Sequence, residues 1–353
     1  MEQTLLNLGE FTKRAFLNGR IDLSQAEAVI DVINAKTSKE VEEGIKQLEG
    51  GLAQEIKKIK ESLLDSITNI EVSIDYPEYD TPVVLNDELK ANIEKSINSL
   101  NKLRETFDNG KIIKEGIKTA IIGRPNAGKS SLLNALLKEE RAIVTEFEGT
   151  TRDTIEEFIN INGIPLKLID TAGIRDTNNE VEKIGIEKSK KLIKQADLVI
   201  FIIDSSKLIS KEDEEILSLI DKNNTIIVLN KIDLKQEIDE TSEKLKNYKN
   251  ILKISAKNRE GINQIYEKVL ELFKLNKITL DNELIITNQR HKIQIEKAIN
   301  NLNGAINGLE LDMPIDIIAI GIKGALEDLG EITGEVASEE IINEIFSRFC
   351  LGK

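Results

Sequence analysis

The 353-residue sequence contains a single cysteine and a single histidine. One cysteine, Cys350, excludes disulfide bonds within the chain and fits a reducing compartment, so we expect a cytoplasmic protein. One histidine, His291, leaves no histidine-based metal centre and no Ser–His catalytic triad. A position on the surface of a helix is expected for it.

Long apolar runs and an excess of positive charge are also absent. No stretch approaches the ~20 consecutive apolar residues of a membrane span, and the N-terminus lacks a basic-then-apolar signal segment. We therefore expect no association with a membrane. The net charge is −14, with a pI of about 4.9. This charge disfavours non-specific nucleic-acid binding, so contact with RNA would need a local patch or a basic partner.

A glycine-rich loop stands between a predicted strand and a predicted helix. Residues 123–130 read G-R-P-N-A-G-K-S, after the apolar run Ile117–Ile122 and before the helical run Leu132–Leu137. The two glycines let backbone N–H groups approach phosphates, and the helix N-terminus is electropositive. Lys129 is predicted to reach the terminal phosphates, and the Ser130 hydroxyl to ligate Mg²⁺. The chain is therefore predicted to bind a nucleoside triphosphate.

Two later loops indicate that the base is guanine. After the apolar strand Thr225–Leu229 come Asn230, Lys231, Ile232 and Asp233. The Asp233 carboxylate can accept two hydrogen bonds from guanine, which adenine does not offer, and the Lys231 stem can pack over the base. After the strand Ile251–Ile254, a loop resembling the second guanine-contacting loop of GTPases contains Ser255, Ala256 and Lys257.

The elements for metal binding and hydrolysis are predicted between these loops. The strand Leu166–Ile169 ends at a turn made of Asp170, Thr171, Ala172 and Gly173. Asp170 can hold Mg²⁺ through water, and the Gly173 N–H can meet the γ-phosphate. In the polar loop Gly149–Asp153, a threonine can ligate Mg²⁺ with GTP bound and release it after hydrolysis, which makes the loop a switch.

One expected catalytic residue is missing. Ras-type enzymes place a water-orienting glutamine directly after the glycine of this turn, but Ile174 occupies that position here. Either hydrolysis is very slow or the catalytic groups come from elsewhere. Nearby polar candidates are Arg175, Glu180, Glu182 and the loop around Asn126.

The pattern along the chain predicts an α/β domain inserted into a helical one. Strand-like runs are confined to residues 117–254 and predict a six-stranded, mostly parallel sheet, with one antiparallel hairpin at Asn162-Gly163. Both flanks show only helical spacing, starting with a capping box at Ser24–Glu27. We expect the flanks to pack as one all-α bundle, divided as 1–112 and 278–353 around a GTPase domain at 113–277. Two separate small bundles are the alternative.

These motifs together resemble the MnmE/TrmE family of tRNA-modification GTPases. Three further segments sharpen the resemblance: Gly9–Leu23 looks like the family's entry into its helical domain, and Val181–Glu187 like its second switch. The last five residues, 349–353, read F-C-L-G-K, similar to the family's F-C-I-G-K terminus. The resemblance implies GTP hydrolysis that drives opening and closing of paired G domains. Members act with a flavoprotein, MnmG, to install a carboxymethylaminomethyl-type group on the wobble uridine of tRNA, position 34.

The resemblance also implies roles for individual residues. Asn126 and backbone groups of Thr145, Phe147 and Thr150 would hold a K⁺ ion where other GTPases use an arginine finger. Glu182 would help to position the attacking water, with Asn126 and Lys129 as the other catalytic residues. Ser130 and Thr151 would ligate Mg²⁺. A one-carbon tetrahydrofolate, 5-formyl or methylene, would contact Arg20 and Lys353.

The complete predicted nucleotide site joins the loops described above. It consists of Asn126, Ala127, Gly128, Lys129, Ser130, Ser131, Thr145, Glu146, Phe147, Glu148, Gly149, Thr150, Thr151, Asp170, Thr171, Ala172, Gly173, Asn230, Lys231, Ile232, Asp233, Ser255, Ala256 and Lys257.

The sequence departs from the family in one respect. Family members carry a further N-terminal domain, which forms the dimer and most of the folate pocket, whereas only Met1–Leu8 precede the matching segment here. GTP chemistry is expected to survive this difference, but folate binding, stable dimerisation and complete tRNA modification are not assured. Two other functions stay open. One is a ribosome-assembly GTPase, which the acidic helical flanks disfavour, and the other is a nucleotide-dependent scaffold without enzymatic activity.

Overall fold

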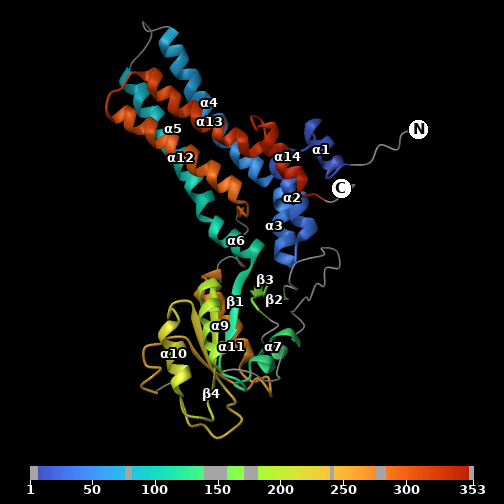
Figure 1. Ribbon diagram of the computed structural model, residues 1–353. Helices are drawn as coiled ribbons and strands as arrows, with labels where there is room; N and C mark the ends of the chain where they lie inside the picture. Colours follow the sequence, from blue (N-terminus) through green and yellow to red (C-terminus); the bar gives the residue numbers. More distant parts are fainter. Residues whose placement is uncertain are drawn as a thin grey trace, which may run out of the picture. The chain divides into compact units, whose positions relative to one another are not determined.

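The computed structural model describes residues 7–75, 82–138, 157–170, 182–238, 242–275 and 284–349. It contains two compact units, the helical unit Met1–Lys114 with Asn282–Lys353 and the α/β unit Glu115–Asp281 (Figure 1). The α/β unit is inserted into the helical unit, so the predicted fold class is confirmed. Within the described ranges, no helix is both long and apolar enough to cross a membrane.

The helical unit is made of helices from both flanks of the insertion. Before it come α1 (Glu10–Leu17), α2 (Leu23–Asn34), α3 (Ser38–Leu48), α4 (Gly51–Asp75), α5 (Pro82–Glu105) and α6 (Phe107–Glu115). After it come α12 (Gln289–Glu310), α13 (Ile315–Thr333) and α14 (Glu339–Ser347). Helices α3 and α4 are separated at Gly50, which adopts a positive φ of 87°.

Four long helices form the bundle that both flanks share. Helix α12 packs along α13 and α5, and α4 packs on α13 and α5; Figure 1 shows the four side by side. Their apolar residues recur every three or four positions and therefore lie on one face of each helix. Leu63 and Ile93 from the first flank join Leu302 and Ile322 from the second in one fully buried cluster. The expected single bundle is confirmed.

The start of α2 differs from the prediction. Its N-cap is Asp22, whose side chain accepts a hydrogen bond from the Gln25 N–H at 3.0 Å, while Gln25 Oε1 accepts from the Asp22 N–H at 2.9 Å. The predicted box at Ser24–Glu27 is wrong by two residues. Because Asp22 takes the cap, Ser24 lies in the first turn and Glu27 is free for a contact with the other flank.

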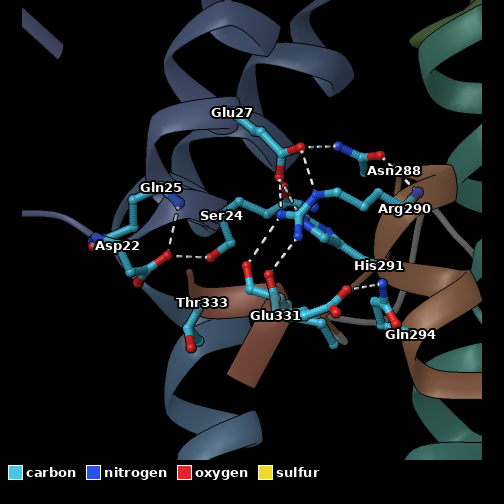
Figure 2. A network of polar contacts seen from close by, with 12 residues as sticks. Asp22, Ser24, Gln25, Glu27, Asn288, Arg290, His291, Gln294, Glu331 and Thr333 are labelled. Carbon is cyan, nitrogen blue, oxygen red and sulfur yellow. Dashed lines mark hydrogen bonds and ion pairs between the residues drawn. The ribbon is translucent and has the colours of Figure 1, made fainter. Parts of the chain in front are cut away.

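That contact is a buried charged cluster between the flanks (Figure 2). Arg290 donates to both oxygens of Glu27, from Nε at 3.0 Å and Nη2 at 2.7 Å, and His291 Nε2 lies 2.7 Å from Glu27 Oε2. Asn288 Nδ2 donates to Glu27 Oε1 at 2.9 Å, and Arg290 Nη1 to the backbone carbonyl of Glu331 at 2.6 Å. His291 is fully buried, so the expectation of a surface histidine is wrong. Its partner lies in the other flank, beyond the reach of a local pattern.

The α/β unit contains one six-stranded sheet in the order β2-β3-β1-β4-β5-β6. The strands are β1 (Ile117–Ile122), β2 (Glu157–Ile161), β3 (Ile164–Leu168), β4 (Leu198–Asp204), β5 (Thr225–Asn230) and β6 (Ile251–Ile254). Only the β2–β3 pair is antiparallel. Asn162 and Gly163 have φ of 51° and 92°, as the predicted two-residue hairpin turn requires. Within the described residues, this unit contains the helices α7 (Lys129–Lys138), α9 (Glu182–Gln195), α10 (Lys211–Leu219) and α11 (Ile262–Leu272).

The Glu27 cluster makes the stability of the helical unit depend on pH. Burial would raise the pKa of Glu27, but the charges and hydrogen bonds of His291 and Arg290 lower it from 4.5 to about 2. A folded-state pKa below the unfolded one stabilises the fold above the unfolded pKa, and this contribution is lost as the pH falls from about 5 towards 2. We expect Glu27→Gln to lower the free energy of unfolding by about 3 kcal/mol at neutral pH. The free energy of unfolding of the variant should then fall less than that of the wild type between about pH 5 and pH 2.

Urea unfolding at a series of pH values, followed by circular dichroism, measures this effect. The control is Glu88→Gln, which makes the same chemical change at an exposed position on α5. If both variants lose stability in parallel with the wild type as the pH falls, the Glu27 cluster does not carry the acid sensitivity.

Candidate functional site

The predicted nucleotide loops gather at one edge of the sheet. In parallel strands, the carboxyl ends lie along the same edge, and the loops that follow them meet there. The loop 123–128 follows β1, and Asp170 comes two residues after β3. Asp204 and Asn230 end β4 and β5, and Ser255 follows β6. The sheet therefore brings the described phosphate and base loops to one place.

The phosphate loop needs its glycines for both space and backbone conformation. Gly123 and Gly128 have φ of 150° and 109°. A Cβ at Gly128 would lie 2.0 Å from the Asn230 amide nitrogen, and one at Gly123 would lie 2.4 Å from the carbonyl oxygen of Ile202. Glycine lets the loop pass this close to β4 and β5 without a side chain in the way.

Lys129 begins α7 and bends back over the phosphate loop. Its ammonium group donates to the carbonyl oxygens of Gly123 at 2.7 Å and Arg124 at 2.9 Å. Burial lowers the pKa of Lys129, because a partly desolvated ammonium group is less favourable than one in water. These two carbonyls place the cation over the loop, so the residues present fit a phosphate-binding site.

Asn230 ties the phosphate loop to both base loops. Its side chain is 2% exposed. The Nδ2 group donates to the carbonyl of Ala127 at 2.8 Å, and Oδ1 accepts from the Ala256 N–H at 3.0 Å. Its own carbonyl accepts from the Ser205 hydroxyl at 2.6 Å. One buried amide side chain therefore satisfies a backbone group in each of two loops, which sets the distance between phosphate and base contacts.

The carboxylate predicted to read the base, Asp233, is held by the loop that follows β6. The Ser255 hydroxyl donates to Asp233 Oδ1 at 2.7 Å and accepts from the Asn258 N–H at 3.2 Å. The Ser255 hydrogen bond lowers the pKa of Asp233, so this exposed carboxyl group is ionised at neutral pH. An ionised carboxylate accepts hydrogen bonds with both oxygens, as the N1–H and 2-amino groups of guanine require.

A partly buried ion pair positions the lysine that precedes this carboxylate in the same loop. Lys231 has a positive φ of 71°, and its ammonium group lies 2.6 Å from Asp204 Oδ2 at the end of β4. Burial would raise the pKa of Asp204, but hydrogen bonds from Lys231 and Ser206 lower it. The ion pair therefore holds the Lys231 side chain close to the carboxyl end of β4.

The structure also gives the positions of four other predicted residues. Asn126 is exposed at the tip of the phosphate loop with a φ of 63°, and Asp170 has a φ of 58° after β3. Glu182 is the first residue of α9. Arg20 is exposed in the helical unit, between α1 and α2.

Several predicted residues lie outside the described ranges. They are Thr145, Glu146, Phe147, Glu148, Gly149, Thr150, Thr151, Thr171, Ala172, Gly173 and Lys353. Ile174 and Cys350, discussed above, lie outside them as well.

The prediction missed two polar pairs that support the site. Asp204 holds Lys231, and Asp213 of α10 holds Arg124 of the phosphate loop, with Arg124 Nε 2.9 Å from Asp213 Oδ2. Asp204 could have been found, because an acidic residue at the end of a fully apolar strand lies at the ligand edge of a parallel sheet. The Arg124–Asp213 pair joins residues that are far apart in the sequence, and no local signal marks it.

Asn230→Asp tests the role of the buried amide. The change keeps the acceptor for the Ala256 N–H but removes the donor to the Ala127 carbonyl and places a carboxylate beside it. A buried carbonyl without its donor costs ~1–3 kcal/mol, so we expect GDP affinity to fall about tenfold or more. Titration of a fluorescent GDP analogue measures this effect.

Asn250→Asp is the matched control at the opposite edge of the sheet. The Asn250 amide donates to the Thr225 carbonyl at 3.3 Å, at the amino end of β5. We expect GDP affinity to change little in this variant. Wild-type affinity in Asn230→Asp would show that the amide does not organise the phosphate loop.

The sequence is similar to those of known proteins over most of its length. A family model described as the MnmE helical domain matches residues 23–350. The tRNA modification GTPase MnmE of Clostridioides difficile (strain 630) is 48% identical over 352 residues, which cover 99% of this chain and 76% of the relative. The MnmE of Finegoldia magna is 49% identical over 354 residues, covering 99% and 77%. Among solved structures, the G domain of the T. maritima FeoB iron transporter is 26% identical, with 44% of this chain and 98% of that chain covered and a TM-score of 0.32. The chain belongs to the MnmE family of tRNA modification GTPases.

Proposed function

We propose that the α/β unit binds and hydrolyses GTP, and that hydrolysis drives the conformational change used to modify the wobble uridine of tRNA. The observation that carries the proposal is that the Asn230 side chain hydrogen-bonds to two loops. Its Nδ2 donates to the Ala127 carbonyl of the phosphate loop at 2.8 Å, and its Oδ1 accepts from the Ala256 N–H in the Ser255 loop at 3.0 Å. A nucleotide can be read at its base and its phosphates together only if the two contact regions keep a defined separation. The family membership supports the reaction and the tRNA substrate.

Two metal ions are proposed to accompany the nucleotide. Ser130 and Thr151 would hold Mg²⁺, with Asp170 acting through water, and Asn126 with the backbone of Thr145, Phe147 and Thr150 would hold K⁺. Both ions would supply positive charge where the γ-phosphoryl group leaves, and the K⁺ ion would take the place of an arginine finger. The positive φ of Asn126, at the exposed tip of the phosphate loop, supports a functional position for it.

Glu182 is proposed to orient the attacking water, because Ile174 occupies the position of the Ras-type glutamine. It begins α9, which the chain enters from the segment that follows Asp170. A carboxylate there can accept a hydrogen bond from water, which isoleucine cannot. The group would act on turnover and leave GDP affinity largely unchanged.

The partners of the family are proposed for this chain as well. The net charge of −14 supports contact with tRNA through a complex and not through this chain alone. An MnmG-type flavoprotein would supply that complex, and the α/β units of two chains would pair during hydrolysis. For folate, Arg20 is an exposed cation within the described residues that could meet a carboxylate, with Lys353 as the second proposed contact.

Asp233→Asn tests the reading of guanine. An amide offers one acceptor and one donor where guanine needs two acceptors, whereas the additional carbonyl of xanthine accepts from that donor. We expect GTP affinity to fall by about tenfold or more and xanthosine triphosphate affinity to rise. Competition binding with both nucleotides measures the preference. Asp221→Asn, an exposed aspartate before β5, is the control. An unchanged preference for GTP in Asp233→Asn would contradict the assignment.

The potassium site predicts a difference between salts. A cation held by Asn126 would stabilise charge on the leaving phosphate, so GTPase activity should be roughly tenfold or more higher in KCl than in NaCl at equal ionic strength. Asn126→Ala should remove this preference, while Asn134→Ala, at an exposed position of α7, should keep it. Phosphate release above the pairing concentration measures the rates. Equal rates in both salts would refute the potassium site and leave GTP hydrolysis in place.

A further inference from the structure

Side-chain contacts hold the phosphate loop at both of its ends. At the end near α7, the Asn230 amide donates to the carbonyl of Ala127 at 2.8 Å. At the end near β1, the Arg124 side chain reaches Asp213 of α10, and Arg124 Nε lies 3.1 Å from Oδ1 and 2.9 Å from Oδ2 of this carboxylate. The first contact fixes the loop relative to the base loops, and the second fixes it relative to α10.

The carboxylate of this ion pair is buried. The Asp213 side chain is 1% exposed, and the Arg124 side chain is 23% exposed. Removal of one partner from a buried ion pair leaves an uncompensated charge, which is far more costly than the pair itself. The Arg124 side chain is therefore strongly favoured in this one position, against α10.

Asp213 is itself fixed on α10. The N-cap residue of this helix, Ser210, donates to Asp213 Oδ2 from its N–H at 3.0 Å and from its hydroxyl at 2.9 Å. One turn further along the helix, Ile216 and Leu217 are buried in the apolar core that α10 shares with the sheet. The carboxylate is therefore a fixed point on a helix that is docked against the sheet.

The backbone of Arg124 in turn holds the lysine of the phosphate loop. Its carbonyl oxygen accepts from the Lys129 ammonium group at 2.9 Å and from the Ala127 N–H at 3.3 Å. The other carbonyl that Lys129 contacts belongs to Gly123, which directly follows β1. Arg124 lies one residue further from the strand, so its ion pair with α10 restrains the carbonyl that holds Lys129.

We propose that Asp213 is a positioning residue for phosphate binding, which acts through Arg124 on Lys129. The proposal rests on the GTP-binding function proposed above. Asp213 holds the Arg124 side chain, and the Arg124 carbonyl holds the ammonium group that is predicted to reach the terminal phosphates. The carboxylate does not meet the nucleotide itself, because its negative charge faces the guanidinium group of Arg124.

The competing explanation is that Asp213 only stabilises α10. The same carboxylate completes the capping box of this helix with Ser210, and loss of a cap loosens the first turn of a helix. The two explanations differ in what depends on Lys129. A loosened helix weakens nucleotide binding whether or not the lysine is present, whereas a positioning residue matters only while the lysine is there to be positioned.

Titration of a fluorescent GDP analogue into the full chain measures the effect. Asp213→Asn removes the charge that holds Arg124 but keeps a side-chain acceptor for the Ser210 N–H. Arg124→Gln removes the same ion pair from the other side. We expect each variant to bind the analogue about tenfold more weakly than the wild type, on the scale of one charge-assisted contact.

Two further variants separate positioning from helix capping. Ser210→Ala removes the capping hydroxyl and keeps the ion pair, so we expect its affinity to stay within about twofold of the wild type while the helix loses some stability. In a chain that already carries Lys129→Ala, Asp213→Asn should weaken binding by less than about twofold, because the group through which Asp213 acts is gone. Circular dichroism confirms that each variant folds.

Three results would overturn the proposal. Folded Asp213→Asn could bind the analogue as tightly as the wild type, or it could lose the same factor of affinity with and without Lys129. It could also bind more tightly, which would mean that Asp213 keeps the Arg124 cation away from the phosphates. A wild-type chain that does not bind the analogue at all would instead refute the GTP-binding function, and this proposal with it.

Discussion

The apolar faces of α4, α5, α12 and α13 impose the constraint on which the rest of the molecule depends. Two of these helices precede the α/β unit in the sequence and two follow it, and neither pair can remove its apolar stripe from water alone. Their joint core forces the chain to return after the insertion. The same return brings Arg290 and His291 to Glu27, where burial of the carboxylate is tolerated because its partners are in place.

A second constraint acts within the α/β unit, where parallel strands deliver separate loops to one edge. The Asn230 side chain fixes the position of two of these loops relative to each other, because its amide forms hydrogen bonds with backbone groups of the phosphate loop and of the Ser255 loop. Ser255 in turn holds Asp233, and Asp204 holds Lys231. The loops predicted to contact the base and the phosphates are therefore linked through side chains that are themselves anchored to the sheet.

The accuracy of the prediction followed the range of the interactions involved. The strand–loop–helix of the phosphate loop, the hairpin at Asn162-Gly163 and the mostly parallel six-stranded sheet depend on local patterns and were predicted from them. The start of α2 was placed two residues late, because Asp22 and Ser24 are both good caps and only the packed helix selects between them. His291 was assigned to a surface because helical spacing alone does not show what another segment places against a side chain.

The sequence by itself determined the glycine-rich loop between β1 and α7, the helical periodicity of the flanks and the family to which the chain belongs. These features depend on short sequence motifs, and such residue types rarely occur at that spacing for another reason. Only the tertiary structure decided that Glu27 pairs with His291, 264 positions away, and that Asp213 holds Arg124. Such contacts depend on how whole helices dock, because burial and charge pairing are settled by neighbours in space and not by neighbours in the sequence.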